Sequence, residues 1–354
     1  MKLLRLNQCL VIAFALVCSA THAFNPDGHK AVGYIADQLL QDTPAGQEAR
    51  RLLDGMSLQD ASVWADCVKG VTSSDSVHFV YKNDDTRFPE CKPFGSAQWK
   101  TRNETYVRMN WTQCGSAHDT EWCHNQYHYA DVSSRRDHYD PKYFGANDHD
   151  VVHAINAALA KLRCEKPPAP FQFADRRQAL MLLAHYVGDI HQPLHVAAIY
   201  LDAQGRTVDP DMGTHGPENE TSGGNQIYFG SAPLHFQWDA VPKSITVESP
   251  TAGDNVVRAR QVAPTSGDLT SWSTTWATDT ISVSKPAFER LIFEYNPSGK
   301  RLPEWALWGE DATYWADADA LKTTQIAKGG ARLAQMLNQL WPDAAAVTAG
   351  QKCD

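Results

Sequence analysis

Residues capable of metal or acid–base chemistry crowd into one apolar stretch, LLAHYVGDIHQPLH at 182–195. His185 and Asp189 are four residues apart, so a helix would place both side chains on one face. Pro193 ends such a helix, and His195 follows on the next turn. Imidazole nitrogen and carboxylate oxygen are ligands that Zn²⁺ accepts. The spacing therefore predicts a metal site at the end of a buried helix.

A second copy of this pair occurs in LHFQWD, where His235 and Asp239 are again four residues apart. A lone histidine in an apolar helix is usually a core residue with satisfied hydrogen bonds, and one such pair arises easily by chance. Two pairs, together with a third histidine at a helix break, favour metal binding over that alternative.

The elements that must position these residues are mostly helical. Apolar residues at helical spacing predict helices over 29–40, 44–53, 148–162, 175–190 and 321–341. Short strands are expected at 77–81, 226–229 and 244–247, and loops at 82–117 and 202–226. We therefore expect a mainly α fold, with long loops over a helical scaffold.

The first 23 residues are typical of a secretory signal peptide, with a basic start, an apolar run and small residues before the cleavage site. Cleavage after Ala23 would make Phe24 the new N-terminus. No later segment approaches the ~20 apolar residues of a membrane span. We expect a secreted or periplasmic protein without a membrane anchor, in which residues 24–354 form one catalytic domain.

Cysteine usage agrees with export. Six cysteines follow the signal segment, an even number that predicts disulfide bonds in an oxidising compartment. Four of them lie between Cys67 and Cys123 and would staple an irregular excursion of the chain. The pairing cannot be deduced from sequence alone; Cys114–Cys123 is the local hypothesis.

The formal net charge is −9, and −11 without the signal segment. By itself this excess argues against nucleic-acid binding through a basic face. Bound cations could reverse the sign locally, because a metal ion is often the largest charge in its site.

Five segments together resemble the S-one/P-one type zinc-dependent single-strand nucleases of fungi and plants, relatives of bacterial zinc phospholipase C. They occur in the family's order from Phe24 to Asp239: FNPDGHKAV at 24–32, WAD at 64–66, HYVGDIHQPLH at 185–195, GGN at 223–225 and LHFQWD at 234–239. The resemblance implies the helical fold of the phospholipase C and zinc nuclease proteins.

The family has one further histidine ligand, followed by an aromatic residue and by aspartate at the third position after it. His78 lacks the aspartate, because Tyr81 stands there, whereas His128 is followed by Tyr129 and Asp131. We choose His128. Residues from about 68 to 120 are then an insertion relative to shorter family members.

The resemblance implies three zinc ions. One would be held by Asp66, His128, His185 and Asp189; a second by His195, His235 and Asp239; and a third by His29, Asp189 and the amine and carbonyl of Phe24. Asp189 would bridge two ions. Phe24 stands where the family usually has tryptophan, but its ligand atoms belong to the backbone.

The implied chemistry is phosphodiester hydrolysis, with Asp66, Lys69 and Asp189 in the catalytic machinery. Zinc lowers the pKa of bound water to ~7 and so supplies hydroxide at neutral pH. By resemblance Lys69 and Asn225 would contact phosphate, and Tyr129 and Asp131 an unpaired base. The expected substrates are single-stranded DNA and RNA, which would be cleaved to 5′-phosphorylated nucleotides. 3′-Mononucleotides, which would lose their phosphate, are expected as further substrates.

Two other functions fit the same residues. A zinc phospholipase C would use this metal frame on a lipid, and it predicts an apolar rim around the site. A non-catalytic exported zinc-binding protein predicts exposed histidine-rich tracts, whereas these ligands are scattered over more than 200 residues. The nuclease, acting as a monomer, is the preferred hypothesis.

Overall fold

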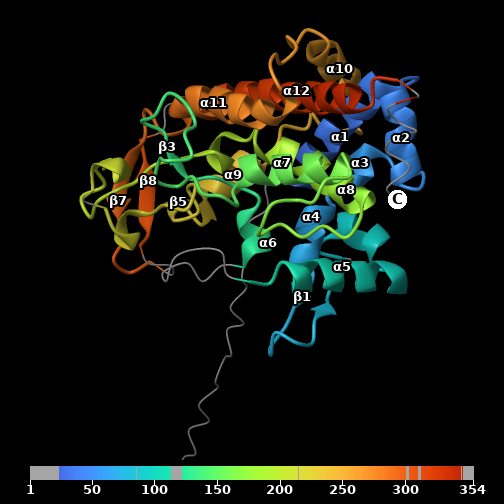
Figure 1. Cartoon of the computed structure of the whole chain (residues 1–354). Coiled ribbons are helices and arrows are strands. Elements are labelled where there is room, and N and C mark those ends of the chain that lie inside the picture. The colour runs from blue at the N-terminus through green and yellow to red at the C-terminus, as the bar shows by residue number, and fades with distance from the viewer. Residues whose placement is uncertain are drawn as a thin grey trace, which may run out of the picture.

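A computed structural model describes residues 24–343 and 345, except 85, 113–121, 214, 300–302 and 310–311. Within this part of the chain the helices are α1 (Pro26–Leu40), α2 (Pro44–Leu52), α3 (Leu58–Ala61), α4 (Trp64–Cys67), α5 (Ala97–Met109), α6 (Cys123–Gln126), α7 (Val151–Leu162), α8 (Arg176–Asp189), α9 (Leu234–Asp239), α10 (Ala252–Ala259), α11 (Trp272–Ser284) and α12 (Tyr314–Leu340). The expectation of a mainly α fold is confirmed (Figure 1).

The strands are short and form three separate sheets. They are β1 (Val71–Thr72), β2 (Val80–Tyr81), β3 (Val132–Ser133), β4 (Ala197–Ala198), β5 (Ile227–Phe229), β6 (Ala232–Pro233), β7 (Ile292–Tyr295) and β8 (Trp305–Trp308). β1 and β2 form an antiparallel hairpin, and β3 pairs with β4 in parallel. The largest sheet has the order β6-β5-β8-β7, with Ile227 opposite Trp305 in its parallel β5–β8 pair.

The predicted helices form where their capping residues allow. The side chains of Thr43 and Asp175 accept hydrogen bonds from the first turns of α2 and α8, as their positions before the apolar runs suggest. Asp150 caps α7, which begins three residues after the expected start, and α12 begins at Tyr314, seven residues before the expected start.

Two of the expected elements are wrong. The segment 82–117, expected to be a loop, contains α5, which Ser96 caps. Its periodic signal is weak because the helix buries little more than Asn103, Tyr106 and Val107. The expected strand at 244–247 is a turn, in which Ile245 alone is buried and to which no neighbouring strand pairs among the described residues.

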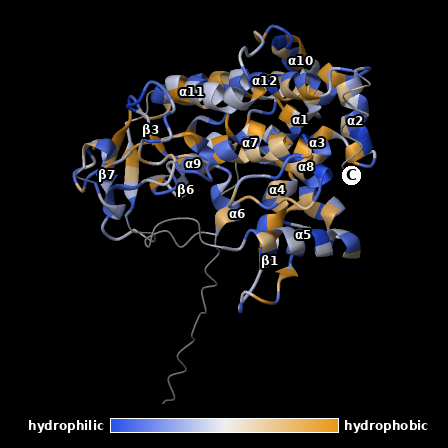
Figure 2. Cartoon of the chain, viewed as in Figure 1, coloured by the Kyte–Doolittle hydropathy of each residue, from blue (hydrophilic) through white to orange (hydrophobic). Residues whose placement is uncertain are grey.

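Two hydrophobic clusters flank the region where the metal motifs lie. The larger is built by α1, α2, α7, α8, α11 and α12, whose apolar faces meet in the middle of the molecule (Figure 2). The smaller surrounds the four-stranded sheet and includes Leu194, Leu234 and Trp238. The chain leaves α8 in the larger cluster and reaches the smaller one through a short 3₁₀ helix, η3 (Pro193–His195). Among the described residues no helix combines the length and hydropathy that a bilayer span requires.

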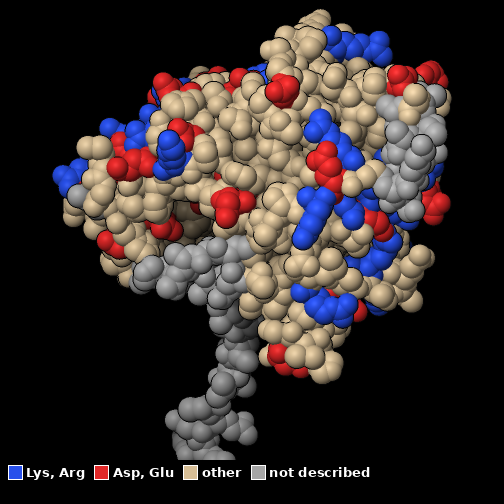
Figure 3. Space-filling model, viewed as in Figure 1, with Lys and Arg blue, Asp and Glu red and all other residues tan. Residues whose placement is uncertain are grey.

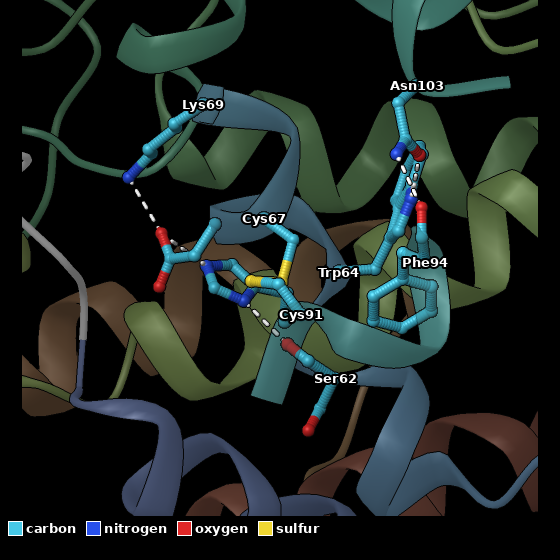
Figure 4. Close-up of a disulfide and its surroundings, with 9 residues drawn as sticks. Ser62, Trp64, Cys67, Lys69, Cys91, Phe94 and Asn103 are labelled. Carbon is cyan, nitrogen blue, oxygen red and sulfur yellow. Dashed lines mark hydrogen bonds and ion pairs between the residues drawn. A yellow bond between two sulfur atoms is a disulfide. The ribbon is translucent and has the colours of Figure 1, made fainter. Parts of the chain in front are cut away.

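One disulfide joins Cys67, at the end of α4, to Cys91 (Figure 4). It ties the β1–β2 hairpin and α5, which lie at the bottom of Figure 1, to the helical body. Cys123 and Cys164 are also disulfide-bonded. Cys114, the hypothetical partner of Cys123, lies outside the described residues.

Candidate metal centre

Eight buried side chains from distant parts of the chain meet between the two hydrophobic clusters. Their ligand atoms form three groups, within each of which all atoms lie no more than 4.8 Å apart: His29, Asp66 and His185; His128, His185 and Asp189; and His195, His235 and Asp239. All eight were predicted ligands. α1, α4, α8 and α9 carry six of them, His128 follows α6, and His195 ends η3.

The group of His195, His235 and Asp239 has the membership that the resemblance implied. The Nε2 atoms of the two imidazoles are 3.0 Å apart, and they lie 3.8 Å and 3.6 Å from the carboxylate oxygens of Asp239. Gln192, which the sequence did not single out, donates a 2.7 Å hydrogen bond to Oδ1 of Asp239. It fixes the orientation of this carboxylate.

The other two groups are adjacent and share His185. Its Nε2 is 3.2 Å from Oδ2 of Asp189 and 3.8 Å from Oδ1 of Asp66. The sequence expectation had placed Asp66 with His128 and paired His29 with Asp189. In the structure His29 lies 3.4 Å from Asp189, and Asp66 lies close to His29 as well, because the His29 and His185 rings stack at 3.7 Å and bring the two ligand sets together.

Asp189 faces both groups with different oxygens. Oδ2 lies 3.0 Å from Nδ1 of His128, whereas Oδ1 lies 3.4 Å from Nε2 of His29. The close approach of His29 depends on Gly188, since a Cβ at that position would be 2.7 Å from Nδ1 of His29. This arrangement suits a carboxylate shared between two cations.

Main-chain carbonyls hold three of the imidazoles. The Nδ1 atoms of His185, His195 and His235 lie 2.6, 2.9 and 2.8 Å from the carbonyl oxygens of Ser62, His128 and Gly223, respectively. A ring that donates its Nδ1 proton presents an unprotonated Nε2 to the centre. Gly223 has a positive φ of 58°, which allows the GGN turn to aim its carbonyl at His235.

Burial keeps these imidazoles neutral. It lowers the pKa of His29 to about 4, and it lowers the pKa values of His128 and His235 to about 3. The same desolvation raises the pKa of Asp239 well above its usual range. His185 is the exception: burial opposes its charged form, but Asp189 and Asp66 outweigh that cost and raise its pKa. Neutral imidazole and carboxylate together are the donor set that a divalent metal requires.

Several contacts fit bound cations better than hydrogen bonds. Within the part of the chain that the structure describes, neither ring nitrogen of His29 has a hydrogen-bond partner. The same is true of Oδ1 of Asp189, which lies 3.4 Å from Nε2 of His29, although all three atoms are buried. Buried polar atoms without partners are uncommon, and these three suit the coordination of a cation. The Nε2 atoms of His195 and His235 lie 3.0 Å apart, and neutral rings that donate their Nδ1 protons to carbonyls have no proton to share between them. A cation bound by both Nε2 atoms would stabilise this arrangement.

The predicted substrate contacts lie around this centre. Nζ of Lys69 is 2.8 Å from Oδ1 of Asp66 (Figure 4). Tyr129 follows His128 directly and is half-buried. Oδ1 of Asp131 would be 3.3 Å from a Cβ at Gly223, so this carboxylate lies beside the turn that holds His235. Asn225 is half-buried and donates from its amide to the Ser222 carbonyl. The roles of these residues stay predictions.

Two other histidines are explained without metal. His78, the rejected alternative, has a side chain that is 81% exposed and contacts Asp75. His191, which lies within the 182–195 motif, is buried, and its ring contacts the Val187 carbonyl and the Arg332 guanidinium.

Lys322 of α12 was missed by the sequence reasoning because lysine in a helix is usually exposed. It is 2% exposed, and its ammonium group donates to the main-chain carbonyls of Gln237 and Ala240, on either side of Asp239. The Asp239 carbonyl itself accepts a hydrogen bond from the amide of Asn25. The C-terminal end of α9 is thus fixed from two directions.

The chain is similar in sequence to known proteins. A family model described as S1/P1 Nuclease matches residues 111–342 and includes six of the eight clustered side chains. Endonuclease 5 of Arabidopsis thaliana is 21% identical over 332 residues, which cover 89% of each chain. Endonuclease 4 of the same plant is 27% identical over 173 residues, or 46% of this chain and 50% of that protein. With the family match covering most of its length, the chain belongs to the S1/P1 nuclease family and is a nuclease.

Proposed function

We propose that this nuclease is a trinuclear zinc phosphodiesterase that cleaves single-stranded DNA and RNA to 5′-phosphorylated nucleotides. The observation that carries the proposal is the burial of eight imidazole and carboxylate side chains in three adjoining groups. His185, His195 and His235 face the other ligand atoms with Nε2, and His128 does so with Nδ1. Buried clusters of this composition are costly without cations, because the carboxylates lose their hydration.

The residues that would hold the ions are those of the three groups, with Asp189 shared. Bound zinc would supply Lewis acidity and a hydroxide nucleophile at neutral pH. The chain's own contribution is geometric: Ser62, His128 and Gly223 orient the imidazoles through their carbonyls, and Gln192 orients Asp239. We propose that Lys69, now paired with Asp66, turns its ammonium group to an incoming phosphate.

The N-terminal residue of the processed chain belongs to this proposal. Phe24 is fully buried, and its ring meets the His29 ring edge-on at 6.5 Å. Removal of a signal peptide would give Phe24 a free amine, whose pKa near ~8 allows a metal to displace its proton. The Cys67–Cys91 disulfide supports secretion or export to the periplasm. We expect the mature protein to act as a monomer.

The substrate preference follows from the side chains around the centre. Tyr129 offers a ring on which an unpaired base can stack, and Asp131 a carboxylate that can accept from base amino groups. A base inside a duplex cannot reach such a ring, so single strands would be preferred. We propose Asn225 as a phosphate contact, and 3′-mononucleotides as additional substrates that release phosphate.

The test is hydrolysis by purified mature protein of single-stranded DNA, duplex DNA, RNA, a 3′-mononucleotide and phosphatidylcholine vesicles. Each is tested before and after EDTA treatment, and again after zinc is restored. Zinc-dependent release of 5′-nucleotides from single strands is the expected result. Metal-independent cleavage would overturn the zinc mechanism, and cleavage of the lipid alone would favour a phospholipase C.

A further inference from the structure

A stack of aromatic rings lies next to α6, outside the predicted ligand set. Trp111 and Trp122 stack with centroids 4.0 Å apart and planes inclined by 18°. Trp111 is also nearly parallel to the His124 ring, with centroids 6.1 Å apart. Phe79 meets the Trp111 ring edge-on at 5.1 Å. We call Trp111 and Trp122 the tryptophan pair.

The tryptophan pair is not simply part of the core. Both rings are half-buried. Trp111 packs against the edge of the larger hydrophobic cluster, whereas Trp122 belongs to neither cluster of the described residues. The β1–β2 hairpin, whose Phe79 contacts Trp111, exposes Val77 and Val80, at 66% and 47%. Aromatic surface in contact with water is available to a ligand that stacks.

Lys69 connects the tryptophan pair to the metal centre. Its ammonium group lies 2.8 Å from Asp66. Burial is the largest cause that lowers the pKa of His124 and of His128. The positive charge of Lys69 is the second cause for both rings. Lys69 therefore lies near both His124, whose ring neighbours Trp111, and His128, a predicted ligand of the centre. If a phosphate of a single-stranded nucleic acid binds at Lys69, neighbouring nucleotides of the same molecule would lie near the tryptophan pair.

The surrounding charge suits a polyanion. Residues 68–112 contain seven Lys and Arg against five Asp and Glu, in a chain whose net charge is −9. Figure 3 shows Lys and Arg side chains on the surface where α5 lies, and acidic side chains at the end of the hairpin below it. β1, β2 and α5 also precede the residues that the family model matches. The surface that these elements form therefore lies outside the part of the chain that the family model matches.

We infer that the tryptophan pair is a stacking subsite for bases of single-stranded DNA or RNA that lie beyond the nucleotide at the metal centre. The inference rests on the proposed function. Stacking on tryptophan accepts any base, so the subsite would favour long substrates over short ones without adding base preference.

The test compares Trp122→Ala with the wild type on a dinucleotide and on an oligothymidylate of about 20 nucleotides. KM for the long substrate should rise roughly tenfold, the loss expected from one stacked base, while kinetics on the dinucleotide stay unchanged. Trp122→Phe keeps an aromatic ring, so its KM for the long substrate should stay close to that of the wild type. The matched control is Trp308→Ala, since Trp308 is 57% exposed on β8 and far along the chain from the pair.

An unchanged KM for the long substrate would overturn the inference. Equal losses on both substrates, with a lower melting temperature, would show a structural role and overturn it as well. A binding experiment separates the stacking subsite from the catalytic proposal. It measures, by fluorescence anisotropy, how the labelled oligonucleotide binds to EDTA-treated protein. If the wild type binds the strand through Trp122 but cleaves nothing, the proposed function fails and the subsite stands.

Discussion

His195 and His235 face one another with Nε2 atoms 3.0 Å apart, while Nδ1 of each ring is engaged by a main-chain carbonyl. A hydrogen bond between the two Nε2 atoms would require one ring to be protonated on both nitrogens. Burial disfavours that charge and lowers the pKa of both rings. A cation between the rings resolves the conflict.

The first prediction is that His235→Ala loses one zinc ion of three. Zinc per chain, measured by plasma mass spectrometry after dialysis, should fall from about three to about two. The rise in melting temperature on adding zinc to EDTA-treated protein should become smaller, since one site no longer contributes binding energy. His78→Ala, at an exposed position, is the control. An unchanged metal content in His235→Ala would exclude this residue as a ligand.

The second prediction concerns Asp189, whose two oxygens face different groups. Asp189→Asn preserves size but removes the charge that two cations would share. Activity on single-stranded DNA should fall to background, and zinc content should fall by more than in His235→Ala. Near-normal turnover would refute the bridging role.

The third prediction tests the approach of His29 to α8. Gly188→Ala places a Cβ where Nδ1 of His29 would be 2.7 Å away, so the ring must move. We expect loss of zinc from the group that contains His29. Gly253→Ala in α10 is the matched control, because a Cβ there meets nothing within 4 Å. Alanine in place of a helical glycine adds up to ~1 kcal/mol of stability in open space, so the control should melt no lower than the wild type.

Residue types and spacing were enough to predict five of the eight clustered side chains, His185, Asp189, His195, His235 and Asp239. The other three, His29, Asp66 and His128, were predicted from the resemblance to the nuclease family. His185 with Asp189, and His235 with Asp239, share helix faces that the four-residue spacing defines. Their supporting contacts could not be predicted, since the partners are carbonyl oxygens, which every residue carries. The grouping of Asp66 with His29 likewise depends on how α1 packs against α8, which no local pattern encodes.

The fold shows the same division. Helices with wide apolar faces, such as α7 and α8, were predictable with an error of a few residues. α5 was missed because it buries few side chains. β7 and β8 were missed because a short strand is defined by its partner, and β8 pairs in parallel with β5, about 80 residues earlier.

The fourth prediction concerns Lys322, which holds the carbonyls on either side of Asp239. Lys322→Met fills a similar volume but leaves those two carbonyls without their donor, at a cost of about 1–3 kcal/mol each. We expect a lower melting temperature and weaker zinc binding at the group of Asp239. Lys322→Arg should recover part of both, and the exposed Lys243→Met is the control. Wild-type zinc affinity in a destabilised Lys322→Met would limit Lys322 to a structural role.

The fifth prediction is a pH dependence of stability in the metal-free protein. Burial, and then the charge of Lys69, lowers the pKa of His124 from 6.5 to about 3. As the pH falls below 6.5, the unfolded chain binds a proton that the folded ring refuses until about pH 3. The free energy of unfolding must therefore decrease through this window.

His124→Phe removes this contribution and keeps an aromatic ring against Trp111. Its melting temperature should fall less steeply between pH 6.5 and 4 than that of the wild type. The exposed His78→Phe serves as the matched control. If the melting temperatures of His124→Phe and the wild type fall in parallel with pH, the folded protein binds the His124 proton as readily as the unfolded chain does. That outcome would contradict the prediction.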